Sequence, residues 1–236
     1  MSFFERPPVK LYLVRHGQSE ANVDHNIYRT VADHGIALTA HGQSQASEAG
    51  LFLKSELEQT APRVITLRSP YRRTRETEAA INEHISPFVD ERIELVEMAE
   101  QQLGVFDGVP NDERAQQFPE QYRRFMMMHD FSGRFWARPP QGDSPYDVYL
   151  RANTVTGLIR FAAKRLKIDH FVLVAHGTWI PCFLMAWCNL PFEWYDSAPM
   201  MKNAEIIKVE GQKIVGTVFQ PTSPTAEAPH TPTPAV

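Results

Sequence analysis

The stretch "KLYLVRHGQSEAN", residues 10–22, decides the fold. A short apolar run ends abruptly at Arg-His-Gly, with His16 at its centre. A second stretch, "HFVLVAHGTWIP" at residues 170–181, repeats the arrangement and places His176 directly before a glycine. Continuous apolar runs of this length are typical of strands that are covered on both faces. The chain therefore twice brings a histidine and a glycine to the end of a buried strand.

Further sequence patterns predict the remaining strands and helices of an α/β protein. Apolar runs predict strands over 9–14, 63–67 and 170–175, and a hairpin over 204–219 that turns at Gly211-Gln212. Apolar residues at helical spacing predict helices over 39–57, 71–85, 144–166 and 178–188. Because strands alternate with helices, we expect a three-layer α/β/α sandwich with a mostly parallel central sheet. Ligands of such folds bind beyond the carboxyl ends of the strands, where both histidines fall.

Length and composition indicate one catalytic domain over residues 1–219 of the 236. Residues 101–145, rich in aromatic residues, prolines, glycines and arginines, are expected to form an insertion of helices and loops that covers the active site. The Pro- and Thr-rich tail, 220–236, is expected to be disordered.

Composition also limits the partners. A net charge of −4 argues against a general nucleic-acid binder, which should carry a concentrated basic face. The first ten residues lack the apolar core of a signal peptide, and no run is long enough to span a membrane. A cytoplasmic protein with neither nucleic acid nor membrane as a partner is therefore expected.

Neither a metal site nor a cofactor is expected. The sequence has no CxxC pair, no HExxH and no EF-hand loop. Its two cysteines, Cys182 and Cys188, fall on different faces of a predicted helix, which argues against a mutual disulfide. We expect both to be ordinary thiols in a reducing compartment.

The residues at the end of the first strand favour anion chemistry. Arg15 offers a planar guanidinium that suits phosphate or carboxylate oxygens. Gly17 permits a tight turn and a close approach of backbone N–H groups to a ligand. Between them, His16 is placed to act as a nucleophile on a bound anion. A histidine that only forms a local hydrogen bond at a strand end is the alternative.

Two further segments reach the same edge of the sheet. His176 and Gly177 precede a helix, and the free N–H groups of a helix start attract anions; a histidine satisfied beneath the helix is the alternative. In "RSPYRRTRET", residues 68–77, Arg73 lies in the first turns of a helix and is placed to point back to the site. Arg72 and Arg75 are expected on the solvated face.

These segments together resemble the histidine phosphatase superfamily, also called the phosphoglycerate mutase-like superfamily. The resemblance rests on four ordered segments spread over roughly residues 9–219. The matched residues are Arg15, His16, Gly17, Ser19 and Asn22; Leu38, Thr39, Gly42, Gln45 and Ala46; Ser69, Pro70, Arg73 and Thr77; and His176 with Gly177. The resemblance implies a phosphate site built from Arg15, Gly17, Asn22, Arg73, His176 and Gly177.

The resemblance also implies a catalytic carboxylic acid. "EQQLGVFDG" places Glu100 at the family's spacing from Gly104 and Gly108. A later Gly-Glu-Ser element is present with Asp143 in place of the usual Glu, and Thr178 stands where a glycine is common. Both departures concern details of the pocket.

The family's reaction is phosphoryl transfer through a phosphohistidine, here on His16. Glu100 would be the general acid and base, and Arg15, Arg73 and His176 would stabilise charge without a metal. Cofactor-dependent mutases carry Phe-x-Gly-Trp soon after the first histidine, whereas this chain has "IYRTVADHGIALT" over 27–39. We therefore expect a histidine acid-type phosphatase, a phosphoric monoester hydrolase, with a mutase-type phosphotransferase or a non-catalytic phospho-ligand or protein interaction module as alternatives.

The insertion is expected to set substrate preference. A small-molecule phosphomonoester is the expected substrate, with a phosphoprotein as the alternative. The aromatic residues of 101–145 would either wall the pocket or anchor the insertion to the core. Four arginines of the insertion either bind a second anionic group of the substrate or lie on the surface. They are Arg123, Arg124, Arg134 and Arg138.

Overall fold

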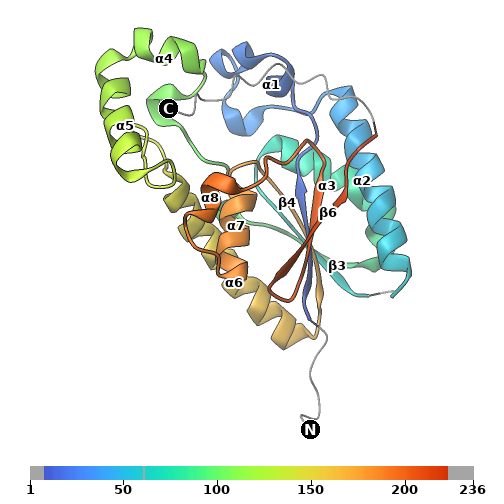
Figure 1. Ribbon diagram of the computed structural model, residues 1–236. Helices are drawn as coiled ribbons and strands as arrows, with labels where there is room; N and C mark the ends of the chain where they lie inside the picture. Colours follow the sequence, from blue (N-terminus) through green and yellow to red (C-terminus); the bar gives the residue numbers. More distant parts are fainter. Residues whose placement is uncertain (1–7, 61, 223–236) are drawn as a thin grey trace.

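A six-stranded sheet in the order β3-β2-β4-β1-β5-β6 forms the middle layer of the molecule (Figure 1). The structure is a computed structural model and describes residues 8–60 and 62–222. The strands are β1 (Lys10–Arg15), β2 (Val64–Arg68), β3 (Val89–Glu94), β4 (His170–Ala175), β5 (Ile206–Glu210) and β6 (Lys213–Phe219). β1 to β4 pair in parallel, and the terminal hairpin adds β5 and β6 antiparallel. The predicted fold class is confirmed.

Helices cover both faces of this sheet (Figure 1). They are α1 (Glu20–Val23), α2 (Ala40–Glu58), α3 (Arg72–Ile85), α4 (Asn111–Gln117), α5 (Pro119–Ser132), α6 (Pro145–Leu166), α7 (Trp179–Cys188) and α8 (Trp194–Ser197). Successive side chains of a strand point to opposite faces. Leu11 and Leu13 accordingly pack in a core with α6 and α7, while Tyr12 and Val14 pack in a second core with α2 and α3. Burial on both faces explains why the strand is continuously apolar.

The four predicted helices are present, and α2 and α6 begin with side-chain caps. Thr39 accepts a hydrogen bond from the Gly42 N–H at the start of α2. Ser144 forms a capping box with Asp147 at the start of α6. Cys182 and Cys188 of α7 are both free thiols.

Strand β3 was not predicted. Its sequence, VDERIE, has no clear alternation, and most of its side chains are exposed. It lies at the edge of the sheet, where one neighbour, β2, supplies its backbone hydrogen bonds. An edge strand without a buried face leaves no hydrophobic signal in the sequence.

The insertion over residues 101–145 forms α4, α5 and their flanking loops, and α4 and α5 lie beyond one end of the sheet (Figure 1). Phe106 is buried at its centre and contacts the rings of Phe118, Tyr122 and Phe125. Phe135 joins the core beneath α6 and α7. The insertion aromatics therefore mainly pack against one another and the core.

The predicted disorder of residues 220–236 concerns mainly residues 223–236, which lie outside the described residues. Thr222, at the end of the described chain, donates its N–H and its hydroxyl to Glu48 Oε2.

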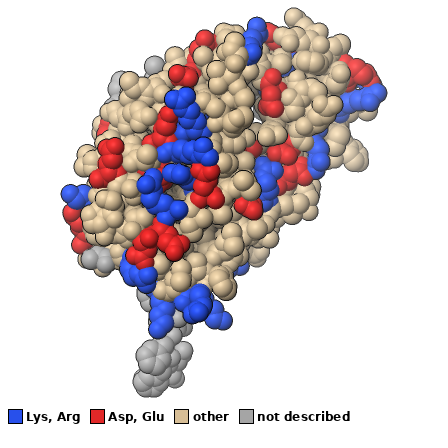
Figure 2. All heavy atoms as spheres, turned by 180° about the vertical axis from the view of Figure 1, so that it is seen from behind, with Lys and Arg blue, Asp and Glu red and all other residues tan. Residues whose placement is uncertain are grey.

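On the face seen in Figure 2, basic and acidic side chains lie beside one another. Exposed ion pairs of the molecule include Arg75–Glu94 and Arg63–Asp90. In the part of the chain that the structure describes, no helix combines the length and the apolar character needed to cross a membrane.

Candidate active site

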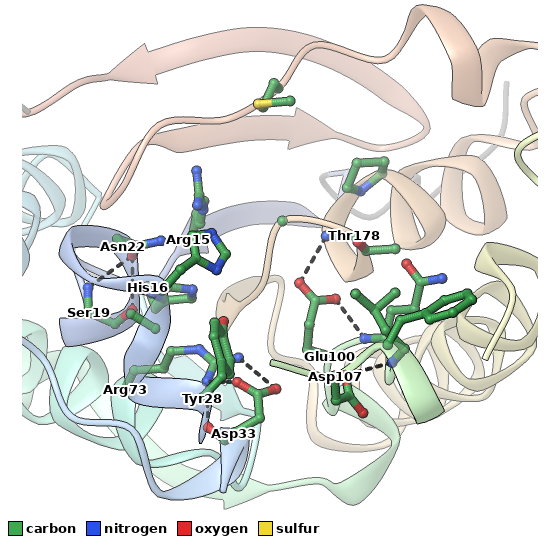
Figure 3. A pocket seen from close by; sticks show the side chains of 18 of the residues that line it. Arg15, His16, Ser19, Asn22, Tyr28, Asp33, Arg73, Glu100, Asp107 and Thr178 are labelled. Atoms are coloured by element: carbon green, nitrogen blue, oxygen red, sulfur yellow. Dashed lines mark hydrogen bonds and ion pairs between the residues drawn. The ribbon is translucent and has the colours of Figure 1, made fainter. Parts of the chain in front are cut away.

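A cavity of about 400 Å³ opens beside the carboxyl ends of β1 and β4 (Figure 3). Six of the eight predicted site residues line it: Arg15, His16, Asn22, Arg73, Glu100 and Gly177. The other two, Gly17 and His176, lie directly beside lining residues. Arg15 and His16 stand on one side of the cavity, and Glu100 stands across from them (Figure 3). Segments far apart in the sequence thus meet at one place.

The two histidines are neighbours because their strands are. β1 and β4 are adjacent and parallel, with Arg15 paired to Ala175, so His16 and His176 leave the sheet side by side. Their ring centroids are 5.4 Å apart at an interplanar angle of 61°. The spatial pairing inferred from the two strand ends is therefore present.

The hydrogen bond of His16 defines its tautomer. Nδ1 lies 2.7 Å from the carbonyl oxygen of Gly17, and a carbonyl can only accept. Nδ1 therefore carries the proton, and Nε2 keeps its lone pair. Burial, followed by the positive charges of Arg73 and Arg15, holds the pKa of His16 well below 6.5. At neutral pH the ring is an uncharged base with a free lone pair on Nε2.

His176 is held through its other ring nitrogen, Nε2. Its Nε2 lies 2.8 Å from Ser69 Oγ, and the Tyr71 N–H donates to the same oxygen at 3.3 Å. The Ser69 hydroxyl can donate to Nε2 or accept from it, so this contact holds the ring in place without defining its tautomer. Nδ1 is buried and has no hydrogen-bond partner among the described residues. Burial, together with Arg73, His16 and Arg15, holds the pKa of His176 well below its usual value.

Arg73 is buried at the start of α3 and lines the cavity, as predicted, but a carboxylate holds it. Its Nη1 donates to the backbone oxygen and to Oδ1 of Asp33, both at 2.7 Å. Arg15 donates to the carbonyl of Met201. Asp33 also lines the cavity and was not predicted, because one acid in a polar loop resembles an ordinary solvated charge.

Glu100 accepts two backbone hydrogen bonds, one on each carboxyl oxygen. The Gln101 N–H donates to Oε1 at 2.8 Å, and the Thr178 N–H donates to Oε2 at 3.1 Å. Burial nevertheless raises the pKa of Glu100; the two N–H groups and Arg73 oppose this effect, and the charge of Asp33 adds to it. Thr178, where the family commonly has glycine, contacts Glu100 through its backbone N–H.

Gly17 lies just beyond the end of β1, where the chain passes close to α2. Its N–H donates to Thr77 Oγ1 at 3.0 Å, so this N–H is already engaged within the protein. A Cβ on Gly17 would lie 2.4 Å from the carbonyl oxygen of Gly42, so the missing side chain allows β1 to approach α2. The phosphate contact expected of Gly17 stays a prediction.

Asn22 and Gly177 shape the cavity. Asn22 Oδ1 accepts from the Ser19 N–H at 2.9 Å and from Asn203 Nδ2 at 3.1 Å, which fixes the amide beside the cavity. A Cβ on Gly177 would lie 3.8 Å from Arg15 Nε and 3.9 Å from Glu100 Oε2. The glycine therefore keeps open the space between the arginine and the acid.

The insertion arginines divide into two groups. Arg123 and Arg124 pair with Glu120, and Arg138 pairs with Asp147, as expected for surface arginines. Arg134 lines the cavity and lies over the ring of Tyr195. Arg114 also lines the cavity and was not predicted. Among the aromatic residues of the insertion, Phe106 alone contributes to this lining.

The fold and the cavity define an α/β protein in which two histidines, two arginines and a buried acid meet at the carboxyl ends of the strands. A model of the histidine phosphatase superfamily (branch 1) matches residues 11–218. The chain belongs to this family. Within residues 8–60 and 62–222, no group of three or more His, Cys, Asp or Glu side chains is arranged to hold a metal ion.

Curated relatives include phosphatase and mutase-like proteins. The phosphoglycerate mutase-like protein AT74 of Arabidopsis thaliana is 34% identical over 218 residues, which cover 86% of this chain and 65% of AT74. The chain thus spans just under two thirds of that relative's length. The broad-range acid phosphatase DET1 of Saccharomyces cerevisiae is 24% identical, covering 89% of this chain and 87% of DET1.

Solved structures show the same fold. A mycobacterial glucosyl-3-phosphoglycerate phosphatase superposes with a TM-score of 0.64 at 25% identity, covering 85% of this chain and 89% of its own. The alpha-ribazole phosphatase of Shigella flexneri has a TM-score of 0.65 at 18% identity, covering 84% of this chain and 89% of its own. These superpositions show that the fold is shared.

Proposed function

We propose that the protein is a phosphomonoester hydrolase that works through a phosphohistidine on His16. The observation that carries this proposal is the hydrogen bond from His16 Nδ1–H to the Gly17 carbonyl. It fixes the ring and leaves the lone pair of Nε2 at the cavity. Because the pKa of His16 is lowered by burial and two arginines, the nucleophile does not first have to lose a proton at neutral pH.

In the first step, the Nε2 lone pair attacks phosphorus and the P–O ester bond breaks. The leaving alkoxide takes a proton from Glu100, whose raised pKa favours the protonated form. In the second step, water attacks the phosphohistidine while the Glu100 carboxylate accepts its proton. The P–N bond breaks, its electron pair returns to Nε2, and inorganic phosphate leaves.

Charge on the phosphoryl oxygens is met by donors already in place. Arg15 and Arg73 supply positive charge. Nδ1 of His176, which is buried without a hydrogen-bond partner among the described residues, donates a hydrogen bond in its protonated form. Such preorganised donors provide most of the catalysis in phosphoryl transfer. We propose that these groups act without a metal ion. The size of the cavity favours a small-molecule phosphomonoester over a phosphoprotein.

The test is release of inorganic phosphate from a panel of phosphomonoesters with chelator present, comparing wild type with His16→Ala. Chelator-resistant release that disappears in the variant supports the proposal. Turnover that is unchanged in His16→Ala would refute the phosphohistidine mechanism. Supplying a bisphosphorylated primer distinguishes a phosphatase from a mutase-type phosphotransferase. Isomerisation of the phosphomonoester without net phosphate release favours the mutase. Phosphate-ester binding with neither reaction favours a non-catalytic module.

A further inference from the structure

Arg114 is a cation in the cavity wall that forms no ion pair within 4.0 Å with a described residue. It lies on α4 in the insertion, is partly buried, and lines the same cavity as His16 and Arg73. Its Nε donates to the carbonyl of Val109 at 3.0 Å, and its guanidinium carbon lies 5.5 Å from the centre of the Phe106 ring. These contacts hold the side chain in place, but neither neutralises its charge.

Nearby acids are committed elsewhere. Glu113, the preceding residue, pairs with Arg29. Asp107 also lines the cavity, but its Oδ1 accepts the Leu103 N–H at 2.9 Å, and among the described residues no carboxylate oxygen lies within 4.0 Å of the Arg114 guanidinium. Burial lowers the pKa of Arg114, and the charge of Asp107 opposes this effect without reversing it. A partly buried cation in a cavity wall that has no close ion pair favours an anionic ligand.

The other arginines of the insertion are a useful contrast. Arg123, Arg124 and Arg138 each pair with an acid, and Arg134 lies 3.6 Å from Asp196. Arg114 alone among the insertion arginines is both in the cavity wall and without such a partner among the described residues.

The position of Arg114 places it away from the phosphoryl end. Glu100 and Asp107 lie across the cavity from Arg15, His16 and Arg73 (Figure 3). Arg114 lies on the same side of the cavity as Asp107, because its Nε donates a hydrogen bond to the carbonyl of Val109, two residues after Asp107. A substrate phosphate held by Arg15 and Arg73 would therefore extend its leaving group past Glu100 toward Arg114.

We infer that Arg114 forms a second anion subsite, and that the preferred substrate is a phosphomonoester whose leaving group carries a carboxylate or a second phosphate. This inference rests on the proposed function, because it names the substrate class for that reaction. Arg114 positions the leaving group and takes no part in bond breaking. Its effect should therefore appear as selectivity between substrates rather than in the chemistry of a neutral ester.

The experiment compares kcat/KM for matched pairs of esters. 3-Phosphoglycerate is paired with glycerol 3-phosphate, which has a hydroxymethyl group in place of the carboxylate. Fructose 1,6-bisphosphate is paired with fructose 6-phosphate, so the two arms separate a carboxylate from a phosphate. A charge-assisted hydrogen bond predicts a preference for the acidic member of at least one pair by about 10- to 100-fold.

Arg114→Gln should reduce that preference to near unity while changing kcat/KM for the neutral member by less than about threefold. Arg114→Lys should restore part of the preference, which separates lost charge from lost packing. Arg124→Gln, an exposed arginine of the same insertion, should leave the preference unchanged. No preference in wild type for either pair, or an unchanged preference in Arg114→Gln, overturns the inference.

Binding separates this inference from the proposed reaction. Calorimetric titration of the same four esters into His16→Ala protein, with and without Arg114→Gln, does not require turnover. Selective binding of an acidic ester that is lost with Arg114→Gln supports the subsite even if wild type releases no phosphate, in which case only hydrolysis fails. Equal binding of both members of each pair, or no binding, overturns the subsite.

Discussion

Replacing Glu100 with glutamine tests the assignment of the acid. Glutamine has the same shape but cannot donate the proton that an alkoxide needs, so kcat for an alkyl phosphate should fall about 10²- to 10⁴-fold. A nitrophenolate leaving group needs no proton. With nitrophenyl phosphate, Glu100→Gln should still form the phosphohistidine rapidly but hydrolyse it slowly, because the second step lacks its base. The expected result is a burst of one nitrophenolate per enzyme, followed by slow turnover.

The structure also predicts a stability change for this variant. Both Glu100 oxygens accept an N–H, from Gln101 and Thr178, whereas glutamine would turn its own NH₂ toward one of these donors. Loss of that hydrogen bond should lower the free energy of unfolding by about 1–2 kcal/mol. A melting temperature lower by about 2–8 °C leaves the variant folded during the assay.

Rapid-quench kinetics with both substrates, alongside Glu97→Gln as a control, decides the matter. Glu97 is close in sequence but does not line the cavity, and its variant should behave as wild type. Equal slowing of the alkyl and nitrophenyl esters without a burst, or wild-type rates on the alkyl ester, would refute Glu100 as the general acid and base.

Four further predictions follow from the same contacts. Gly177→Ala should fold normally but lower kcat/KM by about tenfold or more, because the methyl group fills the space between Arg15 and Glu100; thermal melts and kinetics check this. Gly17→Ala should lower the free energy of unfolding by about 2–3 kcal/mol in urea titrations, because its Cβ meets the Gly42 carbonyl at 2.4 Å. Asp33→Asn removes a charge that raises the pKa of Glu100, so the alkaline limb of the pH–rate profile should move to lower pH; an unmoved limb contradicts this. His16 and His176 have lowered pKa values in the fold, so the unfolded chain binds more protons below about pH 6.5, and the free energy of unfolding should fall as pH drops below that value, less steeply in His16→Asn.

Much of the fold could be predicted because burial on both faces of a strand demands a continuous apolar run. β1, β2 and β4 satisfy that demand, and the helices between them carry apolar residues at helical spacing. β3 carries no such signal, because an edge strand with exposed side chains is held by backbone pairing to β2. The predicted single domain over 1–219 stays a prediction.

The sequence alone determined which chemical groups stand at the strand ends. Arg15, His16, Arg73 and His176 could be named because each immediately follows a strand or begins the next helix, and parallel strands bring such positions to one edge. Their partners could not be named in this way. These partners come from segments remote in sequence. Asp33 forms an ion pair with Arg73, Thr77 accepts the Gly17 N–H, and Ser69 is hydrogen-bonded to His176.

Tertiary structure decided the protonation and charge of the site. A tautomer depends on whether the neighbouring atom accepts or donates, a pKa depends on burial and nearby charges, and a cation is unpaired only if no acid folds against it. His16, Glu100 and Arg114 acquire their chemical character in this way. Local sequence specifies elements through periodicity, whereas solvation and electrostatics depend on distances between segments that only the folded chain brings together.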